Sequence, residues 1–262
     1  MSLQRAVDRY VDGMTSIDSL RRSYGEYARG RLAIRLLKEI SDGQTPDPTE
    51  ITLATGSGEF SRDRGNPGHI AAVRPAIVLG TISSFEGFVE EFLAEALWAK
   101  NYTLAQVANE LGGNNLNNPS VEKWEKLVRM YFSPVSTNGF FMRVDRYTTQ
   151  NNFHSTDDLS WADAKQAASG WMSVRHIITH GGATGLAAEQ WPPPIRQNDV
   201  SPTLVLKPEP AGRHTLRFRS AIGAARIYVQ CAQHLANQVA HAVGTTVDWS
   251  KMPAAFAGAS PP

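Results

Sequence analysis

Four residues whose side chains suit phosphate chemistry fall within two turns of one another if residues 160–182 (SWADAKQAASGWMSVRHIITHGG) form a helix. They are Arg175, His176, Thr179 and His180. A guanidinium offers paired donors to phosphate oxygens, and an imidazole takes or gives a proton near neutral pH. This cluster is the candidate site, and the rest of the chain must position it.

The stretch itself has the pattern of a capped amphipathic helix. Ser160 and Asp163 form an N-terminal capping pair, and the glycines at 181–182 supply a stop. An apolar stripe recurs at three- and four-residue steps: Ala164, Ala167, Trp171, Val174 and Ile178. At about 100° per residue, the candidate residues lie beside and opposite that stripe, off the packed face.

Other segments are predicted to form the helices that pack against it. Helical spacing of apolar residues indicates long helices over 4–40, 71–101 and 220–244, and shorter ones over 103–111 and 120–131. Breaks are expected in the first helix near Gly13 and between residues 25 and 30. In the predicted helix over 71–101, Glu86 lies beside the apolar stripe. Its side chain can be interpreted equally well as a partly buried acid or as a solvated one.

Three segments are predicted to be non-helical. Residues 41–70 are rich in Gly, Pro, Ser and Thr and are expected to form a loop, with a short strand over 50–54 as one option. The Pro-rich insertion 186–219 contains alternating runs typical of a small β-hairpin. Residues 251–262 are expected to be a flexible tail. The prediction is an all-α fold of four to five long helices in a single domain over 1–250, with the hairpin inserted before the last helix.

Composition narrows the function classes. A net charge of +1 over 262 residues gives no overall attraction to nucleic acid or membrane, so RNA contacts would be local. The densest basic patch is Arg213, Arg217 and Arg219. The single cysteine, Cys231, excludes an internal disulfide and a multi-cysteine zinc site. The sequence lacks an apolar N-terminal leader and a run long enough to cross a bilayer, so a cytoplasmic location is expected.

The hexapeptide that runs from Arg175 to His180, RHIITH, resembles the R-x4–6-H signature of HEPN-superfamily ribonucleases. In that family the signature closes a helix of a four- to five-helix bundle. Residues 83–90 (SSFEGFVE) resemble the RiboL-PSP-like branch. The Arg–His spacing alone is a weak signal, because chance gives about 0.5 such pairs in this chain. Arg64 and His69 share the spacing, but Gly and Pro lie between them.

The resemblance implies a metal-independent endoribonuclease without a cofactor that leaves 2′,3′-cyclic phosphate ends. It implies a homodimer in which two Arg–His sets face one another across a shared cleft. His180 would be the acid or base, Arg175 the phosphate clamp, and His176 and Thr179 orienting or contact residues. Glu86 would hold Arg175 in place. A toxin or antiphage defence role follows by the same analogy, with an antitoxin or sensor as a further partner.

Other interpretations stay open. His176 and His180 have the spacing of a two-histidine metal face, but Ile177 stands where zinc proteases carry glutamate. The segment 180–182 has the form of an esterase oxyanion segment, but the chain has no Gly-x-Ser-x-Gly motif. The main alternative is a catalytically inactive HEPN-like module that binds RNA, a nucleotide or a protein.

Overall fold

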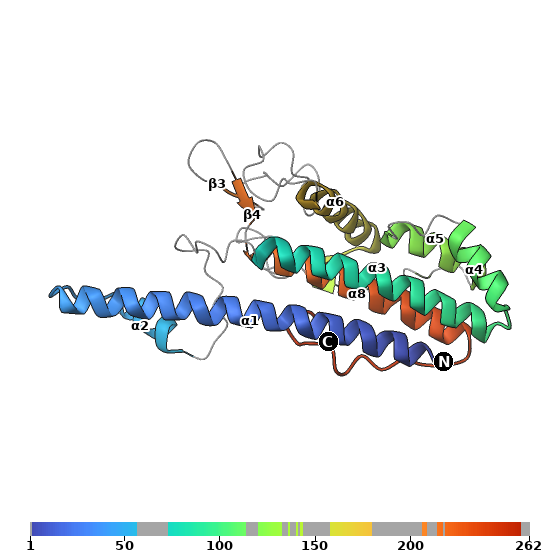
Figure 1. The fold of residues 1–262 in the computed structure, drawn as a ribbon, viewed down its shortest axis with the longest axis horizontal. Helices are drawn as coiled ribbons and strands as arrows, with labels where there is room; N and C mark the ends of the chain where they lie inside the picture. The colour runs from blue at the N-terminus through green and yellow to red at the C-terminus, as the bar shows by residue number, and fades with distance from the viewer. Residues whose placement is uncertain are drawn as a thin grey trace.

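The protein is predominantly helical, which confirms the predicted all-α class (Figure 1). The computed structural model describes residues 2–56, 73–113, 120–132, 136, 140, 142–143, 158–179, 206–208, 214–216 and 218–257. Its helices are α1 (Leu3–Ser41), α2 (Pro48–Thr55), α3 (Val73–Ala99), α4 (Leu104–Gly113), α5 (Val121–Tyr131), α6 (Trp161–Thr179) and α8 (Phe218–Ala242). No helix in the described segments is long and apolar enough to span a membrane.

α3 is the central helix and packs against α1, α6 and α8. Its predicted inner stripe is confirmed, because the side chains from Val78 to Ala96 at helical spacing are fully buried. Aromatic rings dominate this core: Phe85 contacts the rings of Trp124 and Tyr228 edge-on at 5.8 and 4.9 Å between centroids. Such edge-to-face pairs add to the stability gained from burying the rings. These rings join α5 and α8 to α3.

α1 runs unbroken for 39 residues, so the predicted breaks at Gly13 and between 25 and 30 are wrong. A glycine inside a helix costs only about 1 kcal/mol relative to alanine, which packing outweighs here. Gly13 also has a positive role, since a Cβ at this position would lie 2.8 Å from Ser84 Oγ of α3. Its missing side chain allows the two helices to approach closely.

Part of the predicted 41–70 loop is helical. Residues 48–55 form α2, and the optional strand over 50–54 is therefore also wrong. Asp47 caps this helix by accepting a hydrogen bond from the Thr49 amide at 2.8 Å, Pro48 occupies its first turn, and Arg35 of α1 pairs with Glu50 at 2.5 Å. Proline at the first helical position is compatible with a helix because its missing N–H would be unpaired there anyway. Residues 57–70 lie outside the described part of the chain.

The remaining predictions have mixed outcomes. Short antiparallel pairs join β1 (Met142–Arg143) to β2 (Asp158–Leu159), and β3 (Leu206–Pro208) to β4 (His214–Leu216). Residues 209–213 lie outside the described part, so the predicted hairpin remains a prediction.

The predicted flexible tail is wrong for residues 251–257, because Phe256 is fully buried and Met252 nearly so. Their apolar side chains pack into the same core as α1 and α8.

Candidate functional site

Arg175 of α6 faces α3 and forms an ion pair there with Glu86. Arg175 Nη2 donates to Glu86 Oε2 at 3.1 Å, and the two side chains are 21% and 15% exposed. The apolar stripe of α6 explains the placement: Val174 and Ile178 are buried, which turns Arg175 to the edge of the packed face. The Ser160–Asp163 capping pair that starts this helix is also present. The predicted contact between Glu86 and Arg175 is therefore confirmed.

Glu86 sits in an environment that disfavours its charge. Burial raises the pKa of its carboxyl group, with Arg175 lowering it and the nearby Glu90 raising it further. Oε1 is buried and has no hydrogen-bond donor among the described residues. Close by, the buried Tyr228 hydroxyl donates to the Ala168 carbonyl at 2.8 Å, and burial raises the pKa of this phenol too. The carboxylate is thus held mainly by one guanidinium.

The other predicted site residues are only partly placed. Thr179 is the last residue of α6 and its side chain is exposed. His176 lies in α6 by its backbone, but its side chain is outside the described part, as is the whole of His180. Arg213 and Arg217 also lie outside it, and Arg219 is placed only by its backbone in the first turn of α8. The structure therefore joins Arg175 to Glu86 and leaves the remaining members as predictions.

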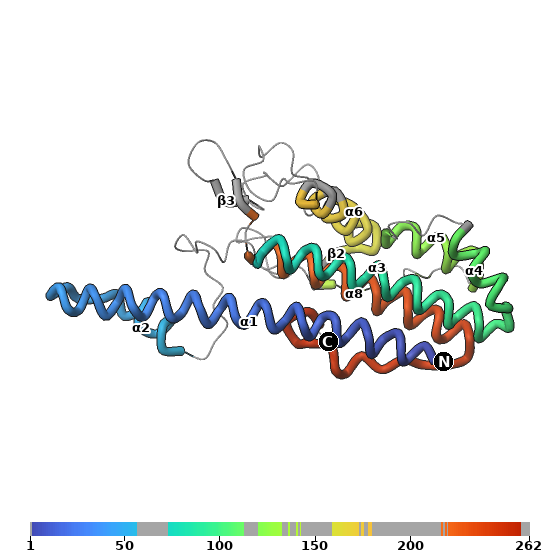
Figure 2. Tube along the Cα trace, in the orientation of Figure 1, coloured from blue at the N-terminus to red at the C-terminus, as the bar shows by residue number. Residues whose placement is uncertain are grey.

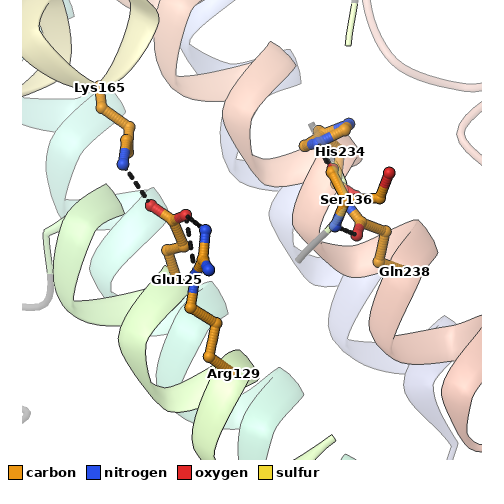
Figure 3. Close-up of polar contacts among 6 residues, drawn as sticks. All are labelled: Glu125, Arg129, Ser136, Lys165, His234 and Gln238. Carbon is orange, nitrogen blue, oxygen red and sulfur yellow. Dashed lines mark hydrogen bonds and ion pairs between the residues drawn. The ribbon is translucent and has the colours of Figure 1, made fainter. Parts of the chain in front are cut away.

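A second ionic cluster, absent from the sequence predictions, ties α5 to α6 (Figure 3). Glu125 is buried and accepts from Lys165 Nζ at 2.6 Å and from Arg129 Nη2 at 2.6 Å. Burial pushes the pKa of Glu125 upward, but the hydrogen bonds from Lys165 and Arg129 outweigh it and the pKa is lowered. The Glu125–Arg129 spacing of four residues was a usable signal. Lys165 comes from another helix, and no sequence pattern indicates it.

His234 of α8 forms a third polar group with Gln238 and the backbone of Ser136 (Figure 3). Its Nε2 lies 3.0 Å from the Ser136 carbonyl oxygen and 2.8 Å from Gln238 Nε2. A protonated Nε2 donates to the carbonyl, and an unprotonated one accepts from the amide. Burial lowers the pKa of His234, and its ring packs on Trp161 at 4.9 Å between centroids. A neutral His234 ring can make one of the two Nε2 contacts in each tautomer, and Gln238 Nε2 also donates to the Ser136 carbonyl at 3.1 Å, so residue 136 is held to α8 in either case.

Neither of these two clusters offers metal-binding geometry. Within the described residues, no group of three His, Cys, Asp or Glu side chains is arranged to hold an ion. Cys231 is fully buried, and burial raises the pKa of its thiol, so it is kept in the unreactive protonated form.

Comparisons with protein-family models, with curated proteins and with solved structures find no match for this chain. What the site does chemically is therefore argued from its own residues.

Proposed function

We propose that the protein is a metal-independent endoribonuclease of the HEPN type, with Arg175 of α6 and His180, which follows α6 in the sequence, as its principal catalytic residues. Two copies would bring two such sets together across a shared cleft. The observation that supports the proposal best is the Arg175–Glu86 ion pair. It fixes the guanidinium of the R-x4-H motif by a second helix, at a position that is still one-fifth exposed to solvent.

The proposed reaction is an internal transfer within RNA. A base, His180 of one copy, takes the proton of the 2′-hydroxyl while its oxygen attacks the adjacent phosphorus. The bond from phosphorus to the 5′-oxygen breaks, and an acid, His180 of the other copy, protonates that oxygen as it leaves. The products are a 2′,3′-cyclic phosphate and a 5′-hydroxyl. Arg175 would bind the non-bridging oxygens, whose negative charge grows in the transition state.

Histidine and arginine suit these tasks for separate reasons. An imidazole with an ordinary pKa near 6.5 is present in both protonation states at neutral pH, as a base and an acid both require. The guanidinium stays charged and presents a planar fork to phosphate. His176 and Thr179 would orient the substrate, and Arg213, Arg217 and Arg219 would bind the RNA backbone away from the scissile bond.

One observation favours an alternative, a catalytically inactive HEPN-like module that binds RNA, a nucleotide or a protein partner. Glu86 partly neutralises Arg175, as a purely structural ion pair would. The two proposals differ in whether His180 is needed for bond breaking. The inactive module predicts binding without cleavage.

The deciding experiment incubates purified protein with labelled RNA in EDTA and follows cleavage. The wild type is expected to cut and to leave cyclic phosphate ends, whereas Arg175→Ala and His180→Ala lose roughly 100-fold or more of the rate. Matched controls are Arg5→Ala and His241→Ala, because both side chains are exposed and lie on other helices.

Intact RNA with the wild type, or equal cutting by the His180 variant of unchanged mass and melting temperature, would overturn the nuclease proposal. Loss of wild-type cutting in EDTA would assign the reaction to a metal instead. Binding of RNA without cleavage would select the inactive module.

A further inference from the structure

The second half of α1 projects beyond the helix bundle, and the short α2 is the only described helix beside it (Figure 2). Tyr24 is the last residue of α1 that packs into the main core, where its ring stacks on Phe218 of α8 at 4.3 Å. After Tyr24, α1 buries only Leu36, and α2 has no buried residue at all. A helix of eight residues has little stability of its own. This projecting pair is therefore unusually poor in buried apolar surface.

The outward face of the projecting half is nevertheless apolar. Ile34, Leu37 and Ile40 are 64%, 66% and 55% exposed, the largest such values in α1. Leu37 and Ile40 lie on the face away from α2, because Arg35 pairs with Glu50 of α2 on the other side of the helix. An exposed row of large aliphatic side chains at helical spacing is a common mark of an interaction surface.

Leu37 and Ile40 of this row also belong to a seam with a two-size pattern, and Ile34 lies at the edge of that seam. Gly30, Ala33, Leu37 and Ile40 follow one another at steps of three, four and three residues, the spacing of a coiled-coil seam. The first two are small and the last two are large. A Cβ placed at Gly30 meets nothing within 4 Å in the described structure, so this position is an open hole on the surface.

We propose that this seam binds the same seam of a second copy, with the two α1 helices antiparallel. In antiparallel packing about a twofold axis near residue 35, the Ile40 side chain of the second copy enters the hole at Gly30, and its Leu37 lies against Ala33. The same contacts recur on the other side of the axis. Parallel packing would set Gly30 against Gly30 and Leu37 against Leu37, which leaves a void at one end and crowding at the other.

Charge and size agree with this arrangement. No charged residue occupies the seam between Gly30 and Ile40, and Arg35 is already paired on the opposite face. The seam spans about 15 Å of helix, which is short for a specific interface, so we expect a weak, reversible dimer that forms at concentrations on the order of tens of micromolar. The contact is separate from the proposed catalytic cleft and does not require nuclease activity.

The test is sedimentation equilibrium of the full chain from 1 to 100 µM. The 28.7 kDa wild type is expected to reach the mass of two chains if the α1 seam alone pairs, and a larger mass if the proposed catalytic cleft pairs as well. Leu37→Glu should weaken association at least tenfold. Gly30→Leu fills the hole and should also weaken it, although leucine is a better helix former than glycine and the melting temperature should not fall. Arg31→Leu, which adds the same side chain one residue away and off the seam, is the matched control.

The register is tested by exchanging the sizes across the seam. Gly30→Leu combined with Ile40→Ala moves the large residue to the other member of each pair and should restore association relative to Gly30→Leu alone. A wild type that stays monomeric at 100 µM, a dimer indifferent to Leu37→Glu, or an exchange that restores nothing would overturn the proposal. A monomer that instead binds vesicles of anionic lipid would assign the stripe to a membrane surface.

Discussion

Two opposing effects meet at Glu86. Burial makes its ionised form costly, while the guanidinium of Arg175 at 3.1 Å favours that form. Burial is the stronger effect, and the pKa of Glu86 is raised. When a native acid has a higher pKa than it has unfolded, the native state binds more protons between the two values. Stability is then fully present below the unfolded pKa and falls as pH rises through the native one.

The raised pKa of Glu86 predicts how the stability of the protein changes with pH. The free energy of unfolding of the wild type should decline as pH rises from about 4.5 through the raised pKa of Glu86, relative to Glu86→Gln, which has no charge to bury. The measurement is urea denaturation of both proteins across this range. Glu90→Gln should keep the decline but make it smaller, because Glu86 still titrates and has lost the nearby charge that adds to its pKa shift. Parallel curves for wild type and Glu86→Gln would contradict the assigned pKa direction.

The same variant bears on the proposed nuclease. Because Glu86→Gln removes the charged partner that positions Arg175, we expect cleavage to slow by roughly tenfold, which corresponds to about 1.4 kcal/mol of transition-state stabilisation. Arg175→Ala should slow it much more. Equal rates for Glu86→Gln and wild type would show that Glu86 has no positioning role.

At the scale of helices, the contact between α1 and α3 depends on an absent side chain. Gly13 faces Ser84 so closely that even a methyl group would lie 2.8 Å from the hydroxyl oxygen and 3.3 Å from Cβ. Across the same interface, a Cβ at Gly80 would lie 3.3 Å from Ile17 Cγ1. The two helices can therefore approach closely, because a glycine on each helix faces a side chain of the other.

We expect Gly13→Val to lower the free energy of unfolding by roughly 1–3 kcal/mol through overpacking. Ser84→Gly should recover part of this loss in the double variant, since it removes the clashing atoms. Gly87→Val is the matched control, because no atom lies within 4 Å of a Cβ at that position of α3. Chemical denaturation of the four proteins checks the prediction, and equal losses at Gly13 and Gly87 would exclude a packing cause.

These helices also indicate what the sequence could and could not reveal. The stripes of α3 and α6 are long and regular, so their buried faces were predictable, whereas the Glu86–Arg175 contact was expected only from the family resemblance. The unbroken α1 was not predictable, because local glycine propensity and the close approach at Ser84 act in opposite directions. α2 was hidden within a polar segment whose capping residues, Asp47 and Pro48, carry the helix signal. Lys165 joins Glu125 only through tertiary packing.

At the scale of the whole molecule, the last described residues bind the first helix to the core (Figure 1). Gln4 of α1 accepts from the Asp248 amide at 2.7 Å and donates to its carbonyl at 3.0 Å. Trp249 packs edge-on against Tyr10 and Phe88. Arg226 of α8 donates to the Ala255 carbonyl at 2.7 Å. Residues 248–257 thus form an anchored strap across α1 and α8, and the flexible-tail prediction is wrong for the part of it from 251 to 257.

Its most deeply buried side chain among the described residues is Phe256, whose ring is fully buried. We expect Phe256→Ala to lower the free energy of unfolding by about 3–5 kcal/mol, because it removes a large apolar side chain and leaves a cavity. Lys251→Ala in the same segment should change it by less than about 0.5 kcal/mol, since Lys251 is exposed. Both values come from urea denaturation, with proteolysis of the folded protein as a second readout. If Phe256→Ala destabilised no more than Lys251→Ala, the strap would be a loose appendage. If Phe256→Ala is the more destabilising change, residues 248–257 hold the first half of α1 in the helix bundle. The projecting second half of α1 is then the part that can contact a second copy.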